Sequence, residues 1–101
     1  MPDAAWKQHE RDVAKALGGK RRGPDVGGVG GGNNDVIVDG LSVECKLLGR
    51  PSWSHCLAAV AQAQAAASDA EVPIAVMRKK GQAKSKALVL MSLNDFVEWF
   101  A

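Results

Sequence analysis

The segment from Asn34 to Lys46 holds two short apolar runs on either side of Asp39-Gly40. An Asp-Gly pair between β-branched runs is the strongest short signal for a β-hairpin with a two-residue turn. Such a turn sets the register of both strands, because paired residues are counted outward from it. The expected pairs are Val38 with Leu41, Ile37 with Ser42, Val36 with Val43, and Asp35 with Glu44.

The last of these pairs is electrostatically unfavourable. Opposed residues have Cβ atoms about 4.5–5.5 Å apart, and two carboxylates at that distance repel by about 3 kcal/mol at an effective dielectric near 20. Lys46 projects from the same strand face as Glu44, whereas Cys45 projects from the other. Carboxylate oxygens are ligands for hard divalent cations, so the hairpin predicts a metal site. The alternative is an exposed hairpin with mixed charges and no function.

Composition indicates a globular protein, with 47% apolar and 24% charged residues. We expect a single domain over residues 1–101, because this is near the commonest domain length. No apolar run approaches the about 20 residues of a membrane span, and the sequence begins with no signal-peptide pattern. We therefore expect a cytoplasmic protein with no membrane partner. Cys45 and Cys56 make neither a metal-ligand nor a disulfide pattern.

The basic residues are unevenly distributed although the net charge is only +2. Eight of the thirteen fall in two clusters: Lys20, Arg21, Arg22, Arg78, Lys79, Lys80, Lys84 and Lys86. Such clusters attract the phosphates of a nucleic acid, and the attraction weakens with salt. The alternative is a pair of solvated loops.

Residues 4–17 predict a helix whose apolar stripe is Trp6, Glu10, Val13 and Leu17. Asp3 can cap its start, and Gly18-Gly19 ends it. Glu10 is unusual because a carboxylate on a buried face requires a partner. It is either a boundary residue paired with an Arg or Lys, or a metal ligand that leans over the hairpin. His9 lies off the stripe and is given no role.

The other elements follow from periodicity and from turn residues. They are a short strand at 20–22, a glycine-rich loop within 18–34, a helix from about 52 to 69, strands buried on both faces at 73–77 and 87–91, and a helix at 93–100. The 52–69 helix has a stripe formed by Trp53, Leu57, Val60 and Gln64. Aromatic residues of the last helix that stay exposed would form a dimer surface.

With Glu10, Asp35 and the tripeptide Glu44-Cys45-Lys46 in this order of elements, the chain resembles the PD-(D/E)XK nuclease superfamily. It resembles most closely the small archaeal-type and phage Holliday junction resolvases. The resemblance covers most of the chain and implies an α/β, restriction-endonuclease-like fold, with a central mixed β-sheet flanked by helices. It also implies a metal-dependent endonuclease that acts as a homodimer and hydrolyses phosphodiesters of branched DNA by paired nicks.

The resemblance assigns roles residue by residue. Asp35, Glu44 and the backbone of Cys45 would bind Mg²⁺, or Mn²⁺ in its place, and Glu10 would bind this ion or a second one. Lys46 would orient or deprotonate the attacking water.

Two points of the match are less direct. Gln62 corresponds best to the family's helix glutamine beside the site, with Gln64 as second choice. The literal Pro-Asp pair of the family signature is Pro24-Asp25, upstream in the glycine-rich loop. We prefer Asp35 because its register opposes Glu44, and Asp25 is the fallback.

Two other functions remain open at the level of sequence. A different structure-specific or nicking phage endonuclease of the same superfamily would share every site residue. A non-catalytic nucleic-acid-binding module would keep the basic clusters only, and Asp35→Asn would then leave all its activity intact.

Overall fold

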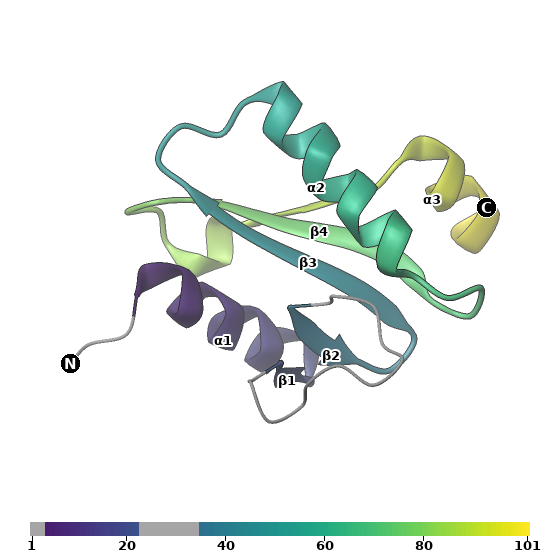
Figure 1. Ribbon diagram of the computed structural model, residues 1–101, viewed down its shortest axis with the longest axis horizontal. Helices are drawn as coiled ribbons and strands as arrows, with labels where there is room; N and C mark the ends of the chain where they lie inside the picture. Colours follow the sequence, from purple (N-terminus) through teal and green to yellow (C-terminus); the bar gives the residue numbers. More distant parts are fainter. Residues whose placement is uncertain (1–3, 23–34) are drawn as a thin grey trace.

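The computed structural model describes residues 4–22 and 35–101 (Figure 1). Asp3 and Asp25, which the sequence singled out, lie outside these ranges. The elements in chain order are α1 (Ala5–Leu17), β1 (Lys20–Arg21), β2 (Val36–Val38), β3 (Leu41–Leu48), α2 (Trp53–Ala66), β4 (Val72–Lys79), the 3-10 turn η2 (Lys84–Lys86), β5 (Leu88–Leu90) and α3 (Leu93–Phe100).

The strands form one mixed sheet in the order β1-β2-β3-β4-β5. Neighbouring strands are antiparallel except β3 and β4, which are parallel and are joined through α2. Gly40, in the turn of the hairpin, has φ +82°, a left-handed conformation that glycine adopts at no steric cost. Three of the four expected hairpin pairs are confirmed: Val36 with Val43, Ile37 with Ser42 and Val38 with Leu41.

Helices cover both faces of the sheet, and in Figure 1 α1 lies below and α2 above the two long strands. Val13 and Ala14 of α1 pack in one buried cluster with alternate residues of β3 and β4, among them Val43 and Val76. Ala59 of α2 packs in a second buried cluster with the intervening residues of β4, Ala75 and Met77. The expected α/β arrangement, a central mixed sheet flanked by helices, is confirmed.

Two glycines let α1 turn directly into the sheet. Gly18 ends the helix at φ +74°. A Cβ on Gly19 would overlap the backbone oxygen of Ile37 and the Cγ2 atom of Val38. Only glycine allows this approach of the chain to β2, which holds α1 against the start of the hairpin.

Strand β4 is buried from Val72 to Met77, as expected for a central strand. The same expectation for residues 87–91 is wrong. Strand β5 is at the edge of the sheet, and Leu88 and Val89 are 64% and 59% exposed. An apolar run does not distinguish a central strand from an edge strand whose faces are uncovered.

The stripe expected for α2 is also wrong. Ala59 and Ala63 are fully buried against the sheet, whereas Trp53 and Leu57 are exposed. Small side chains allow the helix to approach closely, and Ser42 Oγ donates a hydrogen bond of 2.7 Å to the carbonyl of Ala63. This bond ties the last turn of α2 to β3.

Helix α3 begins with Ser92, whose side chain accepts a hydrogen bond from the backbone N–H of Asp95. None of its residues is buried. Within residues 4–22 and 35–101, no helix is long and apolar enough to cross a membrane.

Candidate active site

The hairpin pairing stops in the middle of β3, and this creates a pocket. From Glu44 to Leu48, β3 continues beyond the end of its ladder with β2 and remains paired with β4. Beside this half of the strand is a pocket of about 340 Å³. It is lined by Trp6, His9, Glu10, Asp35, Glu44, Cys45, Lys46, Leu47 and Leu48. Five of the residues singled out in the sequence, from three separate segments, therefore meet at one place.

Asp35 is held at this edge by its backbone and by its side chain. Its N–H donates to the carbonyl of Val43 at 3.2 Å, and its own carbonyl accepts from Arg22 at 2.9 Å. Its carboxylate Oδ2 accepts a hydrogen bond of 2.8 Å from the backbone N–H of Cys45. The fourth expected pair, Asp35 with Glu44, is therefore not part of the ladder. Instead, the Asp35 carboxylate accepts from the backbone N–H of Cys45, which lies on the side of β3 where the pairing with β2 has ended.

The Asp35 and Glu44 carboxyls nevertheless interact directly. Burial and then the negative charge of Asp35 raise the pKa of Glu44 to about 7, with a carboxyl–carboxyl hydrogen bond contributing. Lys46 opposes this shift, since its Nζ lies 3.4 Å from Glu44 Oε1. One ammonium does not compensate two partly buried carboxylates, so Glu44 is partly protonated near neutral pH. A divalent cation between the two carboxylates would remove this repulsion.

Glu10 is on the buried face of α1, as its place in the apolar stripe predicted, and is 8% exposed. Its partner is Arg21 of β1, whose Nε donates to Glu10 Oε1 at 2.7 Å. The first alternative for Glu10, a boundary residue paired with an arginine, is confirmed. The metal-ligand alternative stays a prediction, and Glu10 does line the pocket with Asp35 and Glu44.

The pocket has the kind of ligand atoms that a hard cation binds, but these atoms are only partly grouped around one point. Glu10, Asp35 and Glu44 supply the carboxylate oxygens that Mg²⁺ and Mn²⁺ bind. Among the described residues, no three His, Cys, Asp or Glu side chains are already grouped to hold a metal ion. Asp35 and Glu44 lie together, while Glu10 is turned to Arg21. Ligation by all three carboxylates therefore requires Glu10 either to use its second oxygen or to be released by Arg21.

Neither glutamine expected beside the site lines this pocket. Gln62 is exposed on α2. Gln64 is also exposed, and its Nε2 donates to Asp95 Oδ2 of α3 at 2.9 Å. The α2 face next to β3 and β4 is occupied by small residues instead.

Within the two basic clusters, Arg21 and Arg78 form ion pairs inside the protein, whereas the lysines are exposed. Arg21 is bonded to Glu10, and Arg78 is bonded to Asp12 at 3.3 Å and to the carbonyl of Gln82 at 2.8 Å. These two arginines fix the fold around α1. The lysines of both clusters are exposed, namely Lys20, Lys79, Lys80, Lys84 and Lys86, and they remain available to a polyanion.

Two residues of the pocket wall were missed in the sequence. His9 is 2% exposed, and its Nε2 is 3.2 Å from the carbonyl oxygen of Val76. Trp6 was expected to face the core but is 50% exposed at the pocket. Its position four residues before Glu10 was the available signal, since residues i and i+4 of a helix are neighbours.

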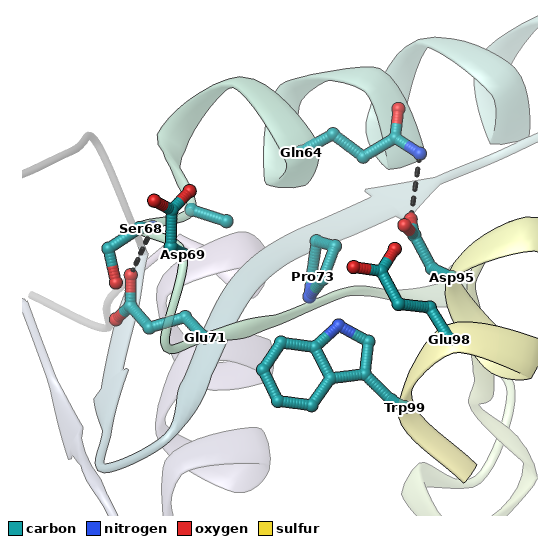
Figure 2. Close-up of a pocket in the computed structure, with 9 residues that line it drawn as sticks. Gln64, Ser68, Asp69, Glu71, Pro73, Asp95, Glu98 and Trp99 are labelled. Carbon is teal, nitrogen blue, oxygen red and sulfur yellow. Dashed lines mark hydrogen bonds between the residues drawn. The ribbon is translucent and has the colours of Figure 1, made fainter.

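A second pocket, of about 390 Å³, lies between the end of α2, the turn after it and α3 (Figure 2). Four of its lining residues are acidic: Asp69, Glu71, Asp95 and Glu98. Figure 2 shows these carboxylates around the indole of Trp99. Among the residues that the structure describes, the lining of this pocket includes no basic residue, whereas the β3 pocket places Lys46 beside its carboxylates.

Comparisons with protein-family models, with curated proteins and with solved structures found no match for this chain.

Proposed function

We propose that this protein is a metal-dependent DNA endonuclease with the restriction-endonuclease-like fold of the PD-(D/E)XK superfamily, and most specifically a Holliday junction resolvase. The observation that carries the proposal is the β3 pocket. There Asp35 and Glu44 line one pocket, and burial together with the charge of Asp35 raises the pKa of Glu44 to about 7. Lys46 Nζ lies 3.4 Å from Glu44 Oε1, and Glu10 lies on the adjoining wall.

In this proposal Asp35, Glu44 and the backbone carbonyl of Cys45 hold Mg²⁺ or Mn²⁺. The bound cation would stabilise charge that develops on the scissile phosphate during in-line hydrolysis. Lys46 orients the attacking water beside Glu44. Glu10 becomes available to the ion when a DNA phosphate draws Arg21 away, because phosphate competes with carboxylate for guanidinium. The exposed lysines would bind the rest of the DNA backbone.

A homodimer is part of the proposal, because two cuts in opposed strands require two active sites. Exposed apolar side chains of β5 and α3 support it, and these residues are called the β5–α3 surface: Leu88, Val89, Leu93, Phe96, Val97, Trp99 and Phe100, all more than a third exposed. Leu88 and Val89 project from opposite faces of the sheet. Leu93, Phe96, Val97 and Phe100 form one apolar stripe of α3, which is the part that a second copy would cover.

A substrate panel tests the function. Labelled four-way junction, linear duplex and single strands of matching sequence are incubated with the protein in Mg²⁺, and the cuts are mapped. Paired symmetric nicks confined to the junction are the expected result. Equal cutting of all three substrates would indicate another nuclease of the superfamily. Binding without cutting in Mg²⁺ or Mn²⁺ would leave the non-catalytic module.

A further inference from the structure

The exposed indole of Trp6 has no evident structural purpose. It lies in the first turn of α1 and is half-exposed at the same pocket as Glu10, Asp35 and Glu44. A tryptophan that completes a core is largely buried, and Trp6 is not in either buried cluster. The chain thus presents a flat aromatic surface at the wall of a carboxylate pocket.

Two cations accompany this ring. Lys7 Nζ lies 5.5 Å from the ring centroid of Trp6, and the guanidinium carbon of Arg21 lies 5.7 Å from it. Exposed cation–π contacts contribute only about 0.5–1 kcal/mol each, so a ligand can displace them. An aromatic face with adjacent basic groups is the combination by which proteins bind unpaired nucleotides, since the base stacks and the phosphate contacts the cations.

From these contacts we propose that Trp6 is a stacking platform for one unpaired nucleobase next to the scissile phosphate, with Arg21 and Lys7 as its phosphate contacts. The inference rests on the proposed nuclease function for the position of the scissile phosphate. It deepens that function because a base inside a duplex has both faces covered by its neighbours. Only DNA with an unpaired or extruded nucleotide can place a base on Trp6.

The volume of the pocket agrees with a single nucleotide. At about 340 Å³ it has the size of a small-ligand site and does not accommodate a stacked base pair together with its neighbours. Arg21 connects the platform to the carboxylates, because it contacts Trp6 and also donates to Glu10. A phosphate that engages Arg21 would therefore place a base on Trp6 and release Glu10 in the same event.

Binding measured in EDTA tests the platform apart from cleavage. The probes are fluorescein-labelled oligo(dT), a four-way junction and an intact duplex. Trp6→Ala is expected to weaken oligo(dT) and junction binding roughly five- to a hundred-fold, the effect of losing one stacked base. Duplex binding should change little, and Trp6→Phe should restore part of the affinity. Trp53→Ala is the matched control, because Trp53 is 76% exposed on α2 and lines no part of the β3 pocket.

Fluorescence supplies a readout that a purely structural role would not change. A Trp53→Phe, Trp99→Phe protein keeps Trp6 as its single tryptophan, and its emission should be quenched on titration with oligo(dT). Unchanged emission at saturating oligo(dT), or equal weakening of all three DNAs by Trp6→Ala, would overturn the inference. If oligo(dT) quenches the Trp6 emission but the protein does not cut DNA in Mg²⁺, Trp6 still stacks on a base and the proposed nuclease function is wrong.

Discussion

At the scale of single residues, the site is organised by one unfavourable charge pair. Asp35 is anchored by the N–H of Cys45, so its carboxylate cannot swing away from Glu44. Lys46 relieves the repulsion only in part, and the pKa of Glu44 remains at about 7. A divalent cation bound between the two carboxylates, as proposed, would relieve the remaining repulsion.

The raised pKa of Glu44 predicts the pH dependence of stability. The folded protein keeps a proton that the unfolded chain releases near pH 4.5, so the folded state binds more protons between about pH 4.5 and 7. Stability must then fall as the pH rises through this window. The shift corresponds to a free energy on the order of 3 kcal/mol.

Thermal unfolding in EDTA between pH 5 and 8 measures this effect. The wild type should lose more stability over that range than Glu44→Gln, whose side chain does not titrate. Glu98→Gln, on the exposed helix α3, is the control and should follow the wild type. Equal pH slopes for wild type and Glu44→Gln would contradict the assignment. Mg²⁺ at pH 8 should recover the lost stability in the wild type but not in Glu44→Gln.

Removal of the ammonium beside Glu44 should affect catalysis more than binding. We expect Lys46→Met to lower the cleavage rate about 10²-fold or more, the usual contribution of a positioned proton-transfer group. DNA affinity should change less than about five-fold, since one lysine supplies only one of many phosphate contacts. Single-turnover cleavage and EDTA binding assays separate the two effects. Lys15→Met, at the exposed end of α1, should leave both unchanged.

At the scale of elements, the features that depend on neighbouring residues in the sequence could be predicted, and those that depend on strand order could not. The Asp39-Gly40 turn alone fixes three pairs of the hairpin, and the stripe of α1 correctly placed Glu10 on a buried face. The edge position of β5 and the alanine face of α2 depend on strand order and on helix approach, which no local pattern encodes. Likewise, the bond from Cys45 to Asp35 exists because the ladder ends one residue early.

The bond between Ser42 and Ala63 should hold α2 against the strand that carries Glu44. Ala63 is in the last turn of α2, where carbonyl groups lack helical partners. We expect Ser42→Ala to lower the free energy of unfolding by about 1–3 kcal/mol, because the buried carbonyl loses its donor. Urea unfolding measures this loss. Ser68→Ala, at an exposed position, should change stability far less, and equal losses would contradict the role of the bond.

The β5–α3 surface predicts concentration-dependent association. Phe100→Glu adds a charge to a side chain that is 61% exposed, so the monomer should fold normally while the dimer is weakened. Sedimentation velocity should show a dimer for the wild type and a monomer for the variant. Leu57→Glu, on the exposed face of α2, should remain dimeric. A wild type that stays monomeric at high micromolar concentration would exclude this surface as the interface.

At the scale of the whole molecule, the two pockets have opposite characters. The β3 pocket combines three carboxylates with Lys46, and Arg21 is bonded to Glu10 of its wall. In the proposed function, exposed lysines of both basic clusters bind the DNA backbone. The α2–α3 pocket is acidic, and it is lined by Trp99, which also belongs to the β5–α3 surface (Figure 2). This separation suits a protein that engages DNA at the first pocket and its own copy near the second.

The most direct test compares junction cleavage by the wild type, Asp35→Asn and Asp39→Asn in Mg²⁺ and in EDTA. The amide oxygen introduced by Asp35→Asn can still accept the bond from Cys45, so the pocket keeps its shape and loses one negative charge. Asp39 is the control, because Asn-Gly serves the same turn as Asp-Gly. We predict metal-dependent paired nicks for the wild type and Asp39→Asn, and none for Asp35→Asn. Undiminished cleavage by Asp35→Asn, or cleavage in EDTA, would contradict the proposal that the Asp35–Glu44 pair is a metal site for DNA hydrolysis.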